Sequence, residues 1–217
     1  HSKLEVAEES RRIMYTAGTT GAPKGVLLTE KAMNAALAGL VQASDAGPDD
    51  VHLSVLPPAL LLEQLAGVFT PLFVGARICF ATSPAQVAMF GATTTVLTPD
   101  ILAAWTAGLR AAGQRGPDTL RFVAVGGAVV APLLAEQAWE LGIPVYEGYG
   151  LSECCSVVAV NRPGERKAGS VGRLLPGVKL RIENGEIIVA ADTVMTGYLQ
   201  HPPVGGEWRT GDLVAID

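Results

Sequence analysis

Hydrophobic residues follow two different spacing patterns along the chain. From Arg12 to about Tyr149, short apolar and β-branched runs bounded by Gly or Pro alternate with stretches whose apolar residues recur at helical spacing. The runs predict strands over residues 13–16, 51–56, 76–80, 94–97, 121–125 and 143–146, and the periodic stretches predict helices over residues 30–43, 60–73, 84–90, 99–112 and 132–141. Because strands that alternate with helices form parallel βαβ units, the pattern predicts an α/β fold, a mostly parallel sheet with helices on both faces.

Capping signals support several of these helices. Thr29 stands directly before the first helix and is a typical N-cap residue, and Met33, Leu37 and Leu40 follow it at helical spacing. Pro99 and Pro132 suit the first turn of a helix, where the missing N–H costs nothing. These signals place the helix starts more firmly than the apolar pattern alone.

The spacing pattern changes after Glu153. Short apolar segments over residues 157–160, 178–182, 186–189 and 213–216 are separated by Gly, Pro and Asn, with no long helical pattern between them. Asn184-Gly185 predicts a hairpin, because this dipeptide accepts the positive φ angles of a type I′ turn. We therefore expect an α/β subdomain over residues 1–155 and a β-rich subdomain, a partial barrel, over residues 156–217.

Composition narrows the class of protein. Charged residues make up 17% of the 217 residues, the net charge is −5, and no basic cluster longer than Arg11-Arg12 occurs, which argues against nucleic-acid binding. No stretch is long and apolar enough for a membrane span, and the N-terminus lacks the apolar core of a signal peptide. Cys79, Cys154 and Cys155 are an odd set that we expect to be reduced and buried. The chain is expected to be soluble and cytoplasmic.

The stretch YTAGTTGAPKGV, residues 15–26, carries the densest candidate chemistry. Gly18, Thr19, Thr20 and Gly21 can turn their N–H groups toward one centre, and Thr16 and Lys24 add a hydroxyl and a positive charge. The spacing does not fit the P-loop, whose lysine precedes Ser or Thr, nor the dinucleotide fingerprint Gly-x-Gly-x-x-Gly. The alternative is an ordinary turn, but twelve residues of this chemistry favour a polyphosphate site.

This stretch resembles the phosphate-binding signature of the adenylate-forming superfamily, which includes acyl-CoA synthetases, luciferases and peptide-synthetase adenylation domains. The usual signature is Tyr-Thr-Ser-Gly-Thr-Thr-Gly-x-Pro-Lys-Gly-Val, and Ala17 is the one departure. The resemblance implies ATP and Mg²⁺ as ligands. It also implies a thiol acceptor, which is coenzyme A or the phosphopantetheine of an acyl-carrier protein.

A second motif follows in the family's order. Gly148-Tyr149-Gly150-Leu151-Ser152-Glu153 resembles the family element Tyr-Gly-x-Thr-Glu, with Ser152 in place of Thr. The resemblance implies that Tyr149 lies against adenine, that Ser152 contacts the α-phosphate and that Glu153 binds Mg²⁺. A flat ring, an alcohol and a carboxylate are chemically suited to these three tasks.

Two shorter motifs complete the nucleotide site that the resemblance implies. Gly126-Gly127-Ala128 resembles the segment beside the adenine and the acyl chain, although a simple tight turn would explain the tripeptide equally well. Trp208-Arg209-Thr210-Gly211-Asp212 resembles Tyr-x-Thr-Gly-Asp, and Asp212 is then the ribose ligand. The intervening segments, including Gly197-Tyr198, match the family's linking β segments and are expected to be structural.

The acid-binding region departs from the family. Residues 56–63, LPPALLLE, resemble a stretch of long-chain acyl-CoA synthetases, but Leu60 stands where those enzymes carry His. Leu60, Leu61 and Leu62 favour a hydrophobic acid, whereas such a run is also typical of a helix core. The arrangement around the substrate carboxylate is therefore left open.

The resemblance implies ATP-dependent activation of a carboxylic acid to an acyl-adenylate and then a thioester, and we expect a fatty or other hydrophobic acid. In the family, a segment precedes the phosphate loop and a C-terminal domain supplies the adenylation lysine. We find neither here, and Lys24 belongs to the phosphate loop. The chain therefore reads as a fragment that is inactive alone.

Three other interpretations remain. A truncated or degenerate module could bind nucleotide without ligase activity. Ser152 in Gly150-Leu151-Ser152-Glu153-Cys154 approaches the nucleophile elbow of an α/β-hydrolase, with His201 as the candidate base, but Cys154 replaces the final Gly. A metal site at Cys154-Cys155 lacks the usual Cys-x-x-Cys spacing.

Overall fold

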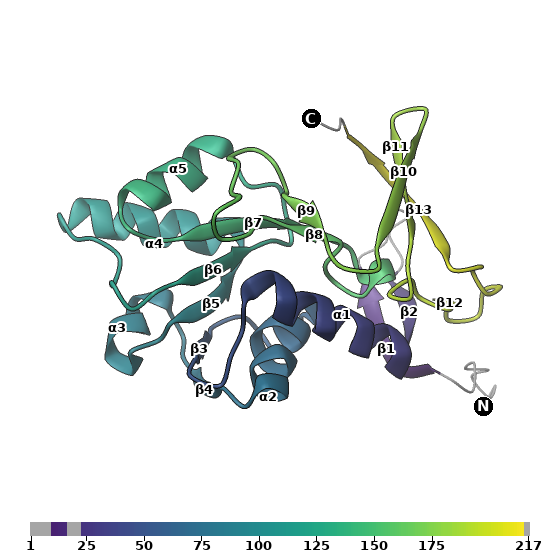
Figure 1. The fold of residues 1–217 in the computed structure, drawn as a ribbon, viewed down its shortest axis with the longest axis horizontal. Coiled ribbons are helices and arrows are strands. Elements are labelled where there is room, and N and C mark those ends of the chain that lie inside the picture. Colours follow the sequence, from purple (N-terminus) through teal and green to yellow (C-terminus); the bar gives the residue numbers. More distant parts are fainter. Residues whose placement is uncertain (1–9, 17–22, 215–217) are drawn as a thin grey trace.

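A computed structural model describes residues 10–16 and 23–214 of the chain. Its largest sheet has seven strands in the order β4-β3-β5-β6-β7-β8-β9 (Figure 1). The first five of these strands run parallel: β4 (Arg77–Phe80), β3 (Val51–Ser54), β5 (Thr94–Leu97), β6 (Phe122–Val125) and β7 (Val145–Tyr149). The short strands β8 (Ala159–Val160) and β9 (Arg173–Leu174) extend it antiparallel.

Helices cover both faces of this sheet. On one face lie α1 (Glu30–Ser44), a π-helix (Glu63–Phe69) and α2 (Thr70–Val74), and on the other lie a 3-10 turn (Pro84–Gln86), α3 (Val87–Phe90), α4 (Pro99–Ala111) and α5 (Pro132–Glu140) (Figure 1). Strands β6 and β7 contribute to both cores, because alternate side chains point to opposite faces. Phe122 packs with α1 and the π-helix, whereas Val123 packs with α4 and α5. The predicted α/β fold is confirmed.

The helix starts follow the sequence signals. The Thr29 hydroxyl accepts a hydrogen bond from the Ala32 amide at 3.0 Å, as the N-cap prediction requires, and Pro99 and Pro132 occupy first-turn positions. The second predicted helix, over residues 60–73, is largely a π-helix, which the apolar pattern did not indicate. In it the fully buried Glu63 side chain lies against Gly67, where a Cβ would come within 2.6 Å of the carboxyl group.

The strand predicted over residues 13–16 does not join the parallel sheet, and that part of the prediction is wrong. It lies in β1 (Ser10–Thr16), which pairs antiparallel with β2 (Lys24–Thr29), and β2 pairs in turn with β12 (Gly197–Tyr198). The sequence analysis missed β2. Only seven residues, 17–23, separate the two strands, whereas a parallel crossover needs a dozen or more.

The third sheet confirms the β-rich pattern of the last third. It contains β10 (Lys179–Glu183), β11 (Glu186–Ala190) and β13 (Glu207–Leu213), all antiparallel. The hairpin between β10 and β11 turns at Asn184 (φ 53°) and Gly185 (φ 84°), as the Asn-Gly dipeptide predicted. The last strand begins at Glu207, earlier than expected, and so includes the motif of residues 208–212.

The division into two subdomains at residue 155 stays a prediction. Strands β8 and β9, which follow that position, still extend the large sheet, and β12 pairs with β2 near the start of the chain. Cys154 and Cys155 are buried free thiols, and burial raises the pKa of each to about 12, while Cys79 is partly exposed and free. Among the helices that the structure describes, none is both long and apolar enough to cross a membrane.

Candidate active site

The predicted phosphate loop connects the paired ends of β1 and β2. Thr16 and Lys24 face each other in the last register position of this hairpin. Gly18, Thr19, Thr20 and Gly21 lie outside the described residues, so their predicted roles stay predictions. The hairpin nevertheless fixes where the loop starts and ends, next to β12.

Lys24 and Glu153 meet through Tyr198. The Lys24 ammonium lies 5.2 Å from the centre of the Tyr198 ring, and the Tyr198 hydroxyl donates a hydrogen bond to the Glu153 carboxylate at 2.7 Å. Burial is the main cause that raises the pKa of Tyr198, and the bond to the Glu153 carboxylate adds to it. The phenol therefore stays protonated and donates this hydrogen bond. A ring from β12 thus joins the end of the loop to the motif of residues 148–153.

The sequence analysis missed Tyr198 as a site residue, because Gly197-Tyr198 was interpreted as a linking segment. An aromatic residue shortly after a predicted strand carries no signal for such a role. Only the pairing of β12 with β2, in which Tyr198 lies opposite Val26, brings the ring beside Lys24.

The motif around Ser152 is a tight backbone structure. Strand β7 ends at Tyr149, and a 3-10 turn, Ser152–Cys154, follows and closes with positive φ angles at Cys155 and Ser156. A Cβ on Gly150 would lie 1.6 Å from the Ser156 carbonyl oxygen. Glycine at position 150 is therefore required by the chain's own backbone.

Tyr149 and Asp212 are the second pair of distant motif residues that the fold brings together. The Tyr149 hydroxyl donates to Asp212 Oδ2 at 2.6 Å, from the end of β7 to β13. Burial and the bond to the carboxylate raise the pKa of Tyr149. The predicted adenine and ribose ligands are thus direct neighbours.

A cavity of about 400 Å³ lies between the large sheet and the helix layer formed by α1, the π-helix and α2. At the carboxyl ends of the strands it is lined by residues predicted for the nucleotide site: Gly126, Gly127, Tyr149, Gly150 and Ser152. Ala128 is exposed and lies outside this lining, as do Thr16, Lys24, Glu153 and Asp212. The site therefore consists of a cavity and of two polar contacts near its end, Tyr198–Glu153 and Tyr149–Asp212.

The walls of the cavity are apolar. Leu60, Leu61 and Leu62 all contribute to them, so this run lines the cavity as well as packing in the helix layer. Glu63, the next residue, is fully buried and accepts a hydrogen bond from the Ser54 hydroxyl. Burial raises the pKa of Glu63 to about 7.

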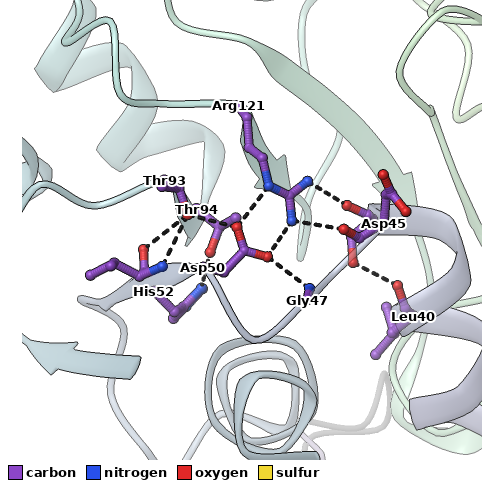
Figure 2. A network of polar contacts seen from close by, with 10 residues as sticks. Leu40, Asp45, Gly47, Asp50, His52, Thr93, Thr94 and Arg121 are labelled. Atoms are coloured by element: carbon purple, nitrogen blue, oxygen red, sulfur yellow. Dashed lines mark hydrogen bonds and ion pairs between the residues drawn. The ribbon is translucent and has the colours of Figure 1, made fainter. Parts of the chain in front are cut away.

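The opposite end of the cavity is closed by a polar network at the start of the strands (Figure 2). Arg121 donates to both oxygens of Asp50, whose carboxylate also accepts from the Gly47 amide at 3.0 Å and the Thr93 hydroxyl at 2.7 Å. Burial opposes the ionisation of Asp50, but these donors outweigh it and lower its pKa. Beside this network, His52 Nδ1 lies 2.9 Å from the Thr94 hydroxyl.

The structure gives no support to the alternative chemistries. The residues after Tyr149 enter a single 3-10 turn, whereas a nucleophile elbow passes directly from strand to α-helix. Among the described residues, no group of three or more His, Cys, Asp or Glu side chains could hold a metal ion, so Cys154 and Cys155 form no metal centre there.

A parallel α/β sheet with Tyr, Ser and Gly residues gathered at the carboxyl ends of its strands defines a small-molecule binding fold of the nucleotide-binding type. A family model of AMP-binding enzymes matches residues 5–199, and the chain belongs to this family.

Curated relatives of this chain include CoA ligases. The chain is 31% identical to the 2-succinylbenzoate–CoA ligase of Staphylococcus epidermidis, with 97% of this chain and 48% of that protein covered. It is 32% identical to the indoleacetate–CoA ligase of Aromatoleum aromaticum, with 93% and 44% covered.

Solved structures agree with the fold. O-succinylbenzoate coenzyme A synthetase of Bacillus subtilis, in complex with ATP and magnesium, superposes with a TM-score of 0.82 at 25% identity, covering 98% of this chain and 50% of that one. ATP-bound MatB of Rhodopseudomonas palustris gives a TM-score of 0.88 at 26% identity, covering 98% and 47%. The chain spans about half the length of the curated relatives it matches.

Proposed function

We propose that the protein carrying this chain is an AMP-forming ligase that activates a carboxylic acid with ATP and transfers the acyl group to a thiol, that of coenzyme A. The observation that carries the proposal is the convergence of three distant motifs. Tyr149 contacts Asp212, and Lys24 and Glu153 share Tyr198, all near one end of an apolar cavity. Membership of the AMP-binding family and the CoA-ligase relatives support it.

The nucleotide binds at the carboxyl ends of the strands. Tyr149 lies against adenine, Asp212 accepts from the ribose hydroxyls, and Ser152 donates to the α-phosphate. Asp212 is suited to this role because it is exposed and its carboxylate accepts one known hydrogen bond, from Tyr149. The remaining predicted contacts are to the phosphates, from Thr16, Gly18, Thr19, Thr20, Gly21 and Lys24, and beside the adenine, from Gly126, Gly127, Ala128 and Gly150.

Glu153 fits the Mg²⁺ that this chemistry uses. Magnesium is bound in proteins by one or two carboxylates together with substrate phosphates, which agrees with the lack of a larger acidic cluster among the described residues. The ion, when bound, neutralises charge on the phosphates. The Tyr198 hydroxyl holds the Glu153 carboxylate, and Lys24 lies over the same ring, which supports a common role of the two residues at the phosphates.

The reaction has two steps. The acid carboxylate attacks the α-phosphorus of ATP, forming the acyl–phosphate bond and releasing pyrophosphate, and the thiol then attacks the acyl carbon and releases AMP. Lys24 and Ser152 stabilise negative charge that develops on phosphate oxygens. The acid has an apolar body, because Leu60, Leu61 and Leu62 line the cavity that extends from the nucleotide site.

The test is ATP–pyrophosphate exchange by the full-length gene product that contains this chain, across aromatic, medium-chain and long-chain acids. Lys24→Ala is expected to lower acid-dependent exchange about a hundredfold, because one preorganised donor to a developing charge contributes about that much. Lys31→Ala is the matched control, since Lys31 is an exposed lysine paired with Asp192. Equal activity of both variants would contradict the assignment of Lys24.

Two further outcomes decide between alternatives. Binding of ATP without exchange for any acid would favour a nucleotide-binding module without ligase activity. Transfer to a phosphopantetheinylated carrier protein but not to free coenzyme A would replace the proposed thiol acceptor.

A further inference from the structure

The cavity runs the whole height of the large sheet. Its lining includes Gly126 at the carboxyl ends of the strands and His52 and Thr94 at their amino ends. Thr94 pairs with Phe122, and the four steps along the strand from Phe122 to Gly126 span about 13 Å at the rise of a strand. A ligand bound by its carboxylate near the nucleotide would therefore reach His52 with its far end.

His52 differs from the other polar side chains at this end of the cavity in its hydrogen bonding. It is 3% exposed, and burial lowers its pKa to about 4 although the nearby Asp50 carboxylate opposes this shift, so the ring is neutral at pH 7. Nδ1 is engaged with the Thr94 hydroxyl, whereas Nε2 is buried and has no hydrogen-bond partner in the described part of the chain.

The polar neighbours of His52 are already paired. Asp50 is held by Arg121, Gly47 and Thr93, and Thr95 donates its hydroxyl to the Leu53 carbonyl. Figure 2 shows His52 beside this network, with its Nδ1 hydrogen-bonded to Thr94. Among the cavity-lining residues that the structure describes, only His52 contributes a buried side-chain nitrogen or oxygen without a partner.

We propose that His52 is a specificity-determining residue, whose Nε2 hydrogen-bonds an uncharged polar group at the end of the acid remote from the carboxylate. The inference rests on the proposed function, since it requires that the cavity holds the acid. It assigns the substrate to acids with an apolar middle and a distal hydroxyl or carbonyl group. A charged end does not fit, because the ring is neutral and Arg121 is already bound to Asp50.

The physical reason is the cost of an unpaired buried polar atom. An acid with an apolar end leaves Nε2 without a partner, whereas a polar end satisfies it, and sites built around such a bond discriminate strongly against the analogue that lacks it. A hydroxyl suits either tautomer of His52, because it can both donate and accept.

The experiment compares pairs of straight-chain acids of equal size on the full-length protein. Each ω-hydroxy acid, from ω-hydroxyhexanoate to ω-hydroxydodecanoate, is paired with the unsubstituted acid one methylene longer, and kcat/KM is measured by acid-dependent pyrophosphate release. At the length that fits the cavity, the hydroxy acid is expected to be preferred about tenfold or more, mainly through a lower KM.

Variants at two positions separate recognition from folding. His52→Leu should abolish or invert the preference, and His52→Gln should restore part of it, because the amide keeps a hydrogen-bonding group. Thr94→Val removes the partner of Nδ1 while leaving Nε2, so it should retain a preference for the hydroxy acid. If His52 had a merely structural role, its substitution would lower kcat/KM equally for both acids of a pair.

The outcomes are distinguishable. If none of the acids supports pyrophosphate release, the proposed function is overturned. If many acids support release, but the ratio of kcat/KM within each pair is the same for wild type and His52→Leu, the role of His52 is overturned. The ligase function is then left intact. If His52→Leu does not fold, a wild-type preference below about twofold at every chain length overturns the inference by itself.

Discussion

The Tyr149 hydroxyl lies 2.6 Å from Asp212, and this hydrogen bond joins residues 63 positions apart in the chain. It links the end of a parallel strand in the large sheet to β13 in the small antiparallel sheet. Because the bond holds a flat ring and a carboxylate next to each other, it sets the spacing between the proposed adenine and ribose contacts. Nucleotide affinity should therefore depend on a hydroxyl group that itself touches no nucleotide.

Tyr149→Phe is expected to raise the KM for ATP about fivefold. The ring still packs against adenine, but a hydrogen bond to a carboxylate at an exposed position is lost, which corresponds to about 1 kcal/mol. The measurement is the KM for ATP in pyrophosphate exchange. Tyr149→Leu, which also removes the aromatic face, should raise it further.

The coupling between the two residues provides the control. Asp212→Asn alone should weaken ATP binding, and adding Tyr149→Phe to it should cost less than Tyr149→Phe costs in the wild-type background. Strictly additive effects would show that the two side chains act independently.

Two glycines of the site are expected to respond differently to alanine. A Cβ on Gly126 would find its nearest neighbours at 3.7 Å, an ordinary contact, so Gly126→Ala should fold and only narrow the cavity, raising the KM for the acid. A Cβ on Gly150 would lie 1.6 Å from the Ser156 carbonyl oxygen, so Gly150→Ala should cost more than about 3 kcal/mol of unfolding free energy.

The KM for the acid checks the prediction for Gly126→Ala, and chemical unfolding checks the stability of both variants. A stable Gly150→Ala protein would mean that the backbone at Ser156 moves easily, and a wild-type KM for Gly126→Ala would place the acid elsewhere.

Gly67→Ala is expected to destabilise the protein by about 1–3 kcal/mol. The new methyl group would lie 2.6 Å from the carboxyl group of the buried Glu63, which the bond from Ser54 holds in place. Urea unfolding measures the effect. Gly108→Ala in α4 is the matched control, because its Cβ meets nothing within 4 Å, and it should stabilise the protein by about 1 kcal/mol.

A second variant identifies the cause. Glu63→Ala should relieve the Gly67→Ala penalty in a double-mutant cycle. An undiminished penalty would assign the effect to the backbone of the π-helix and not to the contact with Glu63.

Glu63 should make the folded state less stable as the pH rises. Its pKa is about 7 in the folded protein against an ordinary value of 4.5, so between these values the folded state binds the proton more tightly than the unfolded chain does. The stabilisation is complete below the ordinary value and lost as the pH rises through about 7, by roughly 2–3 kcal/mol between about pH 5 and pH 8.

Glu63→Gln, an isosteric variant that cannot ionise, isolates this effect. Relative to the wild type, it should gain stability between those two pH values in urea unfolding experiments. The comparison with Glu63→Gln is needed because His52 changes the stability of the wild type with pH in the opposite direction. Its folded pKa of about 4 lies below the ordinary 6.5, so its contribution is present above 6.5 and lost as the pH falls through about 4. A constant difference between Glu63→Gln and wild type would contradict the raised pKa of Glu63.

Local signals were sufficient for much of the secondary structure. The Thr29 cap, the Asn184-Gly185 hairpin and the alternation of strands and helices depend on neighbouring residues, and each was predicted correctly from them. The same signals could not assign β1 to its sheet, because pairing with β2 and β12 is a long-range choice. They also did not indicate a π-helix, whose wider hydrogen-bonding pattern leaves no distinct apolar period.

The sequence by itself determined the family and its motif residues, since the order and chemistry of the motifs survive without knowledge of the fold. Only the tertiary structure decided which of those residues meet, that Tyr198 joins Lys24 to Glu153, and that Tyr149 holds Asp212. It also decided that His52 lines the cavity with one ring nitrogen that has no hydrogen-bond partner among the described residues. The physical reason is that hydrogen-bond partners and burial depend on strand pairing and layer packing between residues far apart in the chain, and residue spacing carries no record of either.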